Sequence, residues 1–274
     1  MHKATLYETN NSMQQLDTAK LLSQYIDQFS WGPNELVLDV GCGPGNVTVK
    51  LLLVNLPSSV IKLVGMDVSP NMIKHATNNY TNPKLEFVVS NIADQNLETV
   101  FQTKFSKIFS FYCLHWVQDQ RQAFSNMFNL LSPGGEVLLL LNASNPIYEL
   151  YEKISTRDKW AKYTQDVARF VSPYHHSKHP ISEMNSLLHQ VGFNIIQCYI
   201  NTSSFSYRNL SDLRQALLSV NPFLERIPDG LQDEFLDDLV DTVLNGNLRE
   251  VFPKENNTVS FNYTQIIVFA AKKK

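Results

Sequence analysis

The segment best suited to hold a ligand is Asp39-Val40-Gly41-Cys42-Gly43-Pro44-Gly45. Glycines let the backbone turn sharply and approach a ligand without a Cβ in the way. A dinucleotide fingerprint would need glycine at position 46, where Asn46 stands. A pyrophosphate needs a helix N-terminus aimed at it, whereas a methionine carboxylate and sulfonium need only a smooth glycine surface and a nearby acid. The ligand-binding positions expected here are Asp39, Gly41, Cys42, Gly43 and Gly45.

Two further groups of residues follow expected strands. Asp67 comes directly after the apolar run 63–66, where its carboxylate can accept hydrogen bonds from both hydroxyls of a ribose. Asn91 comes after the third expected strand, where its amide can meet the edge of an adenine, with Ile92 against the ring. The neighbouring positions added to this binding set are Val68 and Ser110.

Strands that alternate with helices must position these residues. Periodicity and turn residues predict strands at 36–38, 63–66, 85–89, 105–111 and 136–141. They predict helices at 12–29, 46–54, 70–80 and 118–131. This alternation predicts an α/β fold with a doubly wound, mostly parallel sheet. The glycine loop follows a strand, so it lies at the carboxyl edge, where open α/β sheets bind ligands.

The pattern changes after Asn145. We predict helices at 146–170, 181–191 and 210–245, the last broken at Asn221-Pro222, and strands at 193–207 and 259–270. The expected organisation is one domain spanning 1–274. Its core would be 12–145, 193–207 and 258–272, with a helical cap formed by 146–190 and 208–250.

The acid-glycine loop, with an acid after the second strand, resembles the class I S-adenosylmethionine-dependent methyltransferases. The resemblance implies a Rossmann-like, seven-stranded sheet with the last strand inserted antiparallel. It implies S-adenosyl-L-methionine as cofactor and S-adenosyl-L-homocysteine as its product. The alternative is a nicotinamide or other nucleotide enzyme that uses a variant loop.

Nearly the whole chain also resembles a narrower family, the insect juvenile hormone acid methyltransferases. The matching stretches are Leu6-Tyr7, Ser12-Met13-Gln14, 109–116, 128–131, 169–175 and 220–223. Enzymes of that family methylate the carboxylate of farnesoic acid or juvenile hormone acid, in juvenile hormone biosynthesis. The resemblance thus implies an isoprenoid carboxylic acid as the small-molecule partner.

The residues suit that chemistry. A carboxylate with a pKa near ~4 is ionised at neutral pH, so no general base is needed. Gln14 and Trp116 can each donate an N–H without carrying a charge, and so orient the carboxylate while leaving an oxygen free to attack. We expect only an orienting or structural role for His115. Trp116 could instead be a core aromatic, and Gln14 an exposed helix residue. The expected pocket residues are Tyr7, Tyr112, Leu114, Trp160, Phe170, Tyr174 and Phe223.

Two rival functions stay open. One is a methyltransferase for another small or fatty carboxylic acid, as in trans-aconitate-type enzymes. A dicarboxylate pocket should add arginines to the cap, and several are present. They are Arg157, Arg169, Arg208, Arg214, Arg226 and Arg249. A non-catalytic homologue that binds lipid or cofactor is the second alternative, against which the intact glycine loop and Asp67 count.

Composition narrows the partners. The net charge of −3 lacks the excess of basic residues that is typical of nucleic-acid-binding proteins. The longest aliphatic run, 137–141, is too short to span a membrane. The N-terminal segment lacks the apolar stretch of a signal peptide, so we expect a cytoplasmic protein. A homodimer is compatible with the sequence, which does not determine the oligomeric state.

Metal binding is not expected. The cysteines Cys42, Cys113 and Cys198 form no C-x-x-C pair. His175, His176 and His179 could suggest a metal, but no cluster of acids accompanies them in the sequence. We therefore expect these histidines to lie in a solvated loop.

Overall fold

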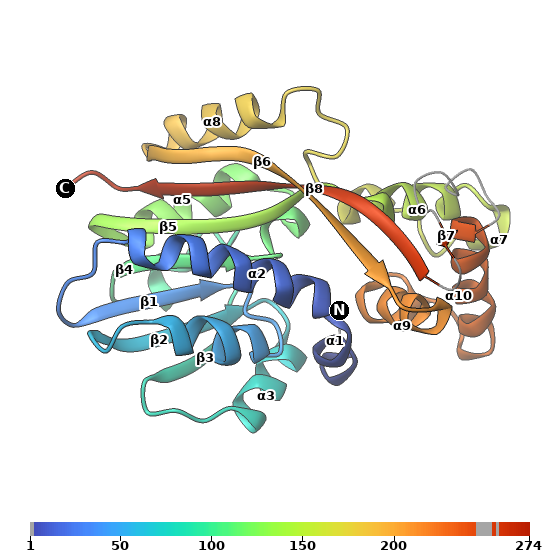
Figure 1. The fold of residues 1–274 in the computed structure, drawn as a ribbon, viewed down its shortest axis with the longest axis horizontal. Coiled ribbons are helices and arrows are strands. Elements are labelled where there is room, and N and C mark those ends of the chain that lie inside the picture. The colour runs from blue at the N-terminus through green and yellow to red at the C-terminus, as the bar shows by residue number, and fades with distance from the viewer. Residues whose placement is uncertain (1–2, 245–253, 256–257) are drawn as a thin grey trace. The chain divides into compact units, whose positions relative to one another are not determined.

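A mostly parallel sheet forms the centre of the fold (Figure 1). The computed structural model describes residues 3–244, 254–255 and 258–274. The sheet has the order β3-β2-β1-β4-β5-β8-β6, and β7 pairs with β8. The strands are β1 Glu35–Val40, β2 Val60–Asp67, β3 Leu85–Val89, β4 Phe105–Phe111, β5 Leu131–Ser144, β6 Asn194–Tyr207, β7 Lys254–Glu255 and β8 Thr258–Ala271. The predicted seven-stranded α/β sheet is confirmed, and the short β7 is added to it.

Neighbouring strands from β3 to β5 pair in parallel. In Figure 1 the arrow of β8 points the opposite way to that of β1, and β8 lies between β5 and β6 in the strand order. The last strand is therefore inserted beside β5. Parallel strands need crossover connections, and these place the chain at the same edge of the sheet after β1, β2, β3 and β4.

Helices connect and cover the strands. The α-helices are α1 Ala4–Asn10, α2 Ser12–Tyr25, α3 Pro70–Asn79, α4 Leu97–Val100, α5 Gln120–Leu130, α6 Pro146–Ser155, α7 Asp158–Ala161, α8 Pro180–Val191, α9 Leu210–Val220 and α10 Asp229–Leu244. The 3₁₀-helices are η1 Ile26–Gln28, η3 Leu114–Trp116, η4 Val167–Phe170 and η5 Leu224–Arg226, and η2 Thr48–Leu53 is a π-helix. The helix α3 begins as predicted, because the Ser69 side chain accepts a hydrogen bond from the Met72 N–H and Pro70 is the first helical residue.

Two compact units make up the chain. The sheet unit comprises residues 2–141, 178–200 and 266–274, and the helical unit comprises 142–177 and 201–265. The helix α8, which lies in the predicted cap segment 146–190, groups with the sheet unit. It does so because it packs against α5, where Arg121 donates to Gln190 and the Phe128 ring meets the Phe193 ring edge to face.

Two predicted helices differ from the structure. The continuous helix expected at 146–170 is broken into α6, α7 and η4, because Arg157 adopts an extended conformation with ψ of 123°. The spacing of Met13, Leu16, Ala19 and Leu22 in the helix expected at 12–29 predicts one apolar face, but in α2 Leu16 is 54% exposed and Asp17 is buried. Among the described helices, none is both long enough and apolar enough to cross a membrane.

Candidate active site

The glycine loop after β1 makes a tight turn, and one of its sides, at Gly43, has space for a ligand. Gly41 and Gly43 have φ of 79° and 55°, in the left-handed region that favours glycine. A Cβ on Gly41 would lie 2.2 Å from the Cβ of Cys113, so no side chain fits there. A Cβ on Gly43 would meet only Tyr7 among the described residues, at 3.9 Å. The loop is therefore packed on one side and open to a ligand on the other.

Asp67, at the end of β2, braces this loop. One carboxylate oxygen accepts from the Gly43 N–H at 3.0 Å and the other from the Ser69 N–H at 2.9 Å. Each oxygen has a second lone pair for a ligand hydroxyl, which fits the predicted ribose role. Burial raises the pKa of Asp67, although the two backbone hydrogen bonds oppose that shift.

Asp39 is buried at the end of β1, and Thr48 donates its hydroxyl to it at 2.6 Å. Burial raises the pKa of Asp39 to about 7; the bond from Thr48 opposes the shift and the charge of Asp67 adds to it. A cationic amino group beside Asp39 would favour the ionised form. The residues present therefore fit the methionine end of S-adenosylmethionine.

Asn91 and Ile92, which are expected around the adenine, follow β3, and Val68 of the same predicted cofactor set follows β2. Val68 is 65% exposed directly after Asp67, so its apolar side chain is available to a ring. Ile92 is buried, and its carbonyl accepts from the Asn126 amide at 2.7 Å. The Asn91 side-chain oxygen accepts from the Ala93 N–H at 3.0 Å, which closes a turn. These contacts hold the loop after β3 in one conformation.

Ser110 also belongs to the predicted cofactor set. It is fully buried in β4, and its hydroxyl donates to the Val40 carbonyl at 2.9 Å. This bond holds β4 against the end of β1, next to the glycine loop.

The segment after β4 carries Trp116, one of the two predicted substrate-orienting residues. Tyr112 has φ of 56°, which is rare for a bulky residue and is often found at functional sites. Its hydroxyl donates to Asp17 of α2, one helical turn after Gln14. The structure therefore ties the helix that carries Gln14 to the segment that carries Trp116.

His115 and Trp116 form part of η3. Trp116 is half-buried, with its ring centroid 5.0 Å from that of His115. Burial lowers the pKa of His115 to about 3, so its imidazole is neutral at any working pH. Leu114 is fully buried. A neutral, poorly basic His115 agrees with chemistry that needs no general base.

Asp17 was missed by the sequence reasoning. It lies 95 residues from its partner Tyr112 along the chain, so no local pattern connects the two. An acid next to the apolar positions of an amphipathic helix was the only available signal.

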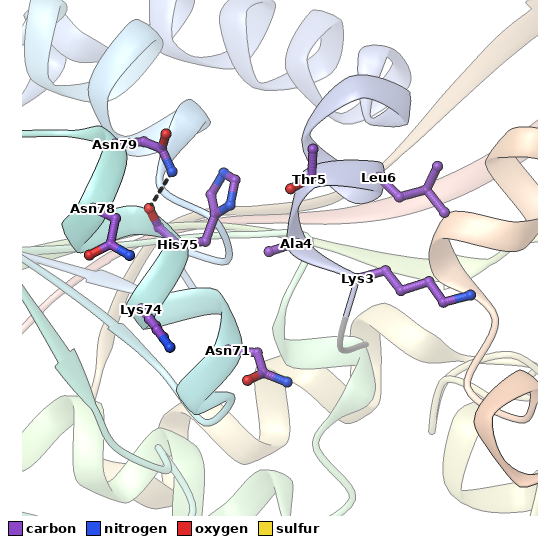
Figure 2. A pocket seen from close by; sticks show the side chains of 9 residues that line it. All are labelled: Lys3, Ala4, Thr5, Leu6, Asn71, Lys74, His75, Asn78 and Asn79. Atoms are coloured by element: carbon purple, nitrogen blue, oxygen red, sulfur yellow. Dashed lines mark hydrogen bonds between the residues drawn. The ribbon is translucent and has the colours of Figure 1, made fainter.

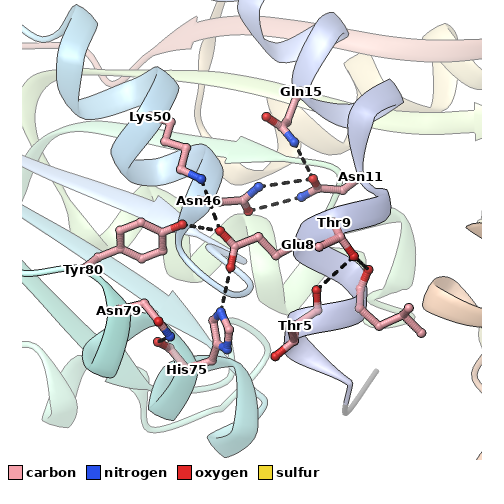
Figure 3. A network of polar contacts seen from close by, with 11 residues as sticks. Thr5, Glu8, Thr9, Asn11, Gln15, Asn46, Lys50, His75, Asn79 and Tyr80 are labelled. Atoms are coloured by element: carbon pink, nitrogen blue, oxygen red, sulfur yellow. Dashed lines mark hydrogen bonds and ion pairs between the residues drawn. The ribbon is translucent and has the colours of Figure 1, made fainter.

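The helix α1 is attached beside the glycine loop through Glu8 (Figure 3). The Glu8 carboxylate accepts from Tyr80, lies 2.7 Å from His75 Nε2 and pairs with Lys50 at 3.3 Å. Partial burial raises the pKa of Glu8, but these hydrogen bonds outweigh it and leave the pKa below its usual value. Tyr7, the neighbouring residue, thereby lies against Gly43. Tyr7, which is predicted for the substrate pocket, therefore lies next to the glycine loop.

A second pair of contacts fixes the same region. The side-chain amides of Asn11 and Asn46 exchange two hydrogen bonds of 3.2 Å (Figure 3). Asn46 is the residue that replaces the third glycine of a dinucleotide fingerprint. Its role in the structure is therefore to join the glycine loop to the start of α2.

An open cavity of about 490 Å³ lies between α1 and α3 (Figure 2). Thr5 and Leu6 of α1 and the preceding Lys3 line one side, and Asn71 and Lys74 of α3 line the other. None of its lining residues belongs to the predicted cofactor set. The cavity thus marks an outer edge of the α1 attachment and not the glycine loop itself.

The expected pocket residues of the helical unit are mostly packed in its interior. Trp160 is fully buried, donates its indole N–H to Asp238 at 2.6 Å and meets Phe235 edge to face. Phe223 is also fully buried, and Tyr174 is nearly so. Phe170 is half-buried, with its ring centroid 5.2 Å from that of Phe223. Of these four, Phe170 presents the most side chain to a ligand.

The histidines of the 175–179 segment do have an acidic neighbour. His176 Nε2 lies 2.7 Å from the Glu152 carboxylate of α6. The sequence shows no cluster of acids beside these histidines, and the fold adds the one acid Glu152. The two partners are 24 residues apart, and the turns between α6 and η4 bring them together.

Comparison with known proteins gives consistent matches. Residues 15–198 match the family described as "Methyltransferase domain". The chain is 36% identical to a juvenile hormone acid O-methyltransferase of Drosophila melanogaster, over 99% of this chain and 93% of that protein. It is 34% identical to one from Bombyx mori, over 99% and 98%. A crystal structure of a Bacillus halodurans C-125 protein, described as a methyltransferase, superposes with a TM-score of 0.61 at 19% identity, over 94% of this chain and 100% of that one.

Proposed function

Because the chain belongs to the juvenile hormone acid O-methyltransferases, within the methyltransferase-domain family, we propose that it methylates the carboxylate of a long isoprenoid acid, farnesoic or juvenile hormone acid. S-adenosylmethionine, when bound, supplies an electrophilic methyl group on a sulfonium. The product of the acid is its methyl ester. The residues of this chain have to hold both molecules in line and keep water away.

On the cofactor side, the glycine loop supplies an open surface and Asp67 two acceptors for the ribose. Asp39 adds a buried negative charge for the amino group. The exposed side chain of Val68 and the braced loop after β3 suit an adenine ring. Each of these groups binds or orients, and none has to move a proton during the reaction.

On the acid side, the carboxylate is already ionised, so catalysis is mainly positioning. Gln14 and Trp116 would each donate an N–H to one carboxylate oxygen and leave the other free to attack. The bond between Asp17 and Tyr112 supports this arrangement, because it fixes α2 against the segment after β4. Neutral donors leave the nucleophile more reactive than an arginine would.

The observation that carries the choice of substrate is the state of the arginines in the helical unit. A dicarboxylate pocket would need arginine side chains available to a ligand. Instead, five of them pair with aspartates of the same unit, while Arg249 lies outside the described residues. The pairs are Arg157–Asp238, Arg169–Asp166, Arg208–Asp212, Arg214–Asp233 and Arg226–Asp166. The interior beside them is aromatic, which favours an apolar chain over a second carboxylate.

A cytoplasmic location is part of this proposal. The cysteines Cys42, Cys113 and Cys198 are all free thiols. Burial raises the pKa of each of them, so they are poor nucleophiles and poor partners in thiol exchange. Three unreactive thiols suit a reducing compartment.

The proposal is tested by methyl transfer from a labelled cofactor to farnesoic acid and to farnesol, which has the same chain without the carboxylate. We expect a base-labile ester from the acid and no product from the alcohol. Asp67→Ala is the control, because losing hydrogen bonds to a charged acceptor should weaken cofactor binding by about 1.5–3 kcal/mol. Labelling of farnesol, or of neither compound, would contradict the proposal.

A further inference from the structure

Glu152, His175 and His176 form a cluster of metal-ligating side chains inside the helical unit. Glu152 lies on α6, and the two histidines lie on the segment after η4. One potential ligand atom from each residue lies within 4.8 Å of the other two. His176 Nε2 and the Glu152 carboxylate are already in contact at 2.7 Å. None of the three belongs to the predicted cofactor or carboxylate-orienting residues.

His175 is held in the orientation of a ligand. Its Nδ1 lies 2.9 Å from the Ser144 hydroxyl, and its ring packs against the ring of Tyr148 with centroids 5.2 Å apart. When Nδ1 carries the proton and donates it to Ser144, the lone pair lies on Nε2. Metal-binding histidines are commonly fixed in this way, with the second nitrogen bonded to an oxygen.

The Nε2 atom of His175 is the feature that packing leaves unexplained. It is shielded from solvent and has no hydrogen-bond partner among the described residues. Leaving a buried polar atom without a partner is unfavourable by about 1–3 kcal/mol. The contact between His176 and Glu152 gives each of those two side chains a partner. It leaves the Nε2 atom of His175 without one among the described residues.

We propose that Glu152, His175 and His176 bind a divalent transition-metal ion of the Zn²⁺ type, with water in the remaining position. Two imidazoles and a carboxylate suit Zn²⁺, Ni²⁺ or Cu²⁺, whereas Mg²⁺ and Ca²⁺ prefer oxygen ligands throughout. Bonds of roughly 2.0–2.2 Å to such an ion hold neighbouring ligand atoms about 3.3 Å apart, so the His176–Glu152 contact of 2.7 Å has to open to admit the ion. His176, whose side chain is 69% exposed, can rotate to do so. The bound ion would link α6 to the 175–176 segment and stabilise the helical unit.

The test uses the untagged full-length protein after chelator treatment and dialysis. Titration calorimetry with ZnCl₂ should show a single ion bound per chain, and MgCl₂ should show none. His176→Ala and Glu152→Gln should each weaken Zn²⁺ binding by at least about tenfold. His189→Ala, which removes an exposed histidine of α8, should bind as the wild type does. No binding to the wild-type protein, or unchanged binding to both site variants, would overturn the proposal.

Thermal unfolding provides a second readout that does not depend on calorimetric heats. Zn²⁺ should raise the melting temperature of the wild type and of His189→Ala, because an ion that binds only the folded state stabilises it. It should leave the melting temperature of His176→Ala unchanged. An equal rise in His176→Ala would show that the ion binds elsewhere. Methyl transfer is not the readout, so failure here is distinct from failure of the proposed function.

Discussion

Asp39 combines burial with two neighbours that shift its pKa in opposite directions. In the free folded protein its carboxyl keeps a proton up to about pH 7, whereas in the unfolded chain it loses the proton near its ordinary value of 3.8. Its contribution to the free energy of unfolding is therefore fully present below pH 3.8 and is lost as the pH rises through 7. Cofactor binding should show the opposite trend, because the cationic amino group favours the ionised carboxylate.

We therefore expect cofactor affinity to increase between pH 5.5 and pH 7.5, by up to about tenfold per pH unit on the acid side. Asp39→Asn should bind more weakly at pH 7.5 and lose most of this dependence. Calorimetric titration with S-adenosylmethionine at four or five pH values measures both effects. The same slope in Asp39→Asn as in the wild type would assign the titration to another group.

Trp116→Phe keeps the aromatic ring and removes the indole N–H. Losing this donor to a charged carboxylate should lower kcat/KM by about 10- to 100-fold while cofactor affinity stays nearly unchanged. Gln14→Ala should behave in the same way. Trp31→Phe is the matched control, since its indole N–H donates to the Ile26 carbonyl at 2.9 Å, away from the residues assigned to the acid. Normal turnover by Trp116→Phe and Gln14→Ala together would place the carboxylate elsewhere.

Among the elements, three central strands share a buried charge cluster. Lys107 of β4 lies 3.8 Å from the Glu35 carboxylate of β1 and 3.3 Å from that of Glu136 on β5. All three side chains are buried, so the lysine neutralises two carboxylates that would otherwise repel each other. The cluster therefore fixes how these strands pair at this end of the sheet.

Lys107→Met should reduce the free energy of unfolding by about 3–5 kcal/mol, because it leaves buried carboxylates without their cation. Adding Glu35→Gln and Glu136→Gln to the variant should restore part of this loss. Lys62→Met removes an exposed ion pair with Glu86 and should change stability by less than about 1 kcal/mol. Denaturant titration measures all four proteins, and equal effects at Lys62 and Lys107 would contradict the assignment.

Helices and strands could be predicted from the sequence where neighbouring residues alone determine them. β3 and β4 have the predicted bounds, because short apolar runs between turn residues are typical of buried strands. On α2 the apolar spacing pointed to Leu16, but the buried face includes Asp17, since Tyr112 supplies a partner that makes burial of an acid favourable. The break after α6 depends on the conformation of Arg157, for which the sequence has no glycine or proline signal.

Some parts of the candidate site could be predicted from the local sequence, and others depend on the folded chain. The glycine loop and the acids at the ends of β1 and β2 could be predicted, because crossover connections bring strand ends to one edge of the sheet. The pairings Asp17–Tyr112 and Glu152–His176 join residues distant in sequence, so only the folded chain places them together. The expected pocket residues Trp160 and Phe223 illustrate a further limit: aromatic composition does not distinguish a packed interior from a ligand surface.

For the whole molecule, the central claim is that the acceptor is a long apolar chain with one carboxylate. A fifteen-carbon acid has about nine more carbons to bury than a six-carbon acid, at roughly 0.8 kcal/mol each before binding costs are subtracted. The arginines of the helical unit already pair with aspartates, so a second carboxylate on the substrate would have to compete with those aspartates for them.

The most direct measurement is kcat/KM for farnesoic acid, hexanoic acid and trans-aconitate under identical conditions. The account predicts that farnesoic acid is preferred over both by at least about 100-fold, the result of burying several more carbons. Equal values for the three acids, or a preference for trans-aconitate, would contradict it.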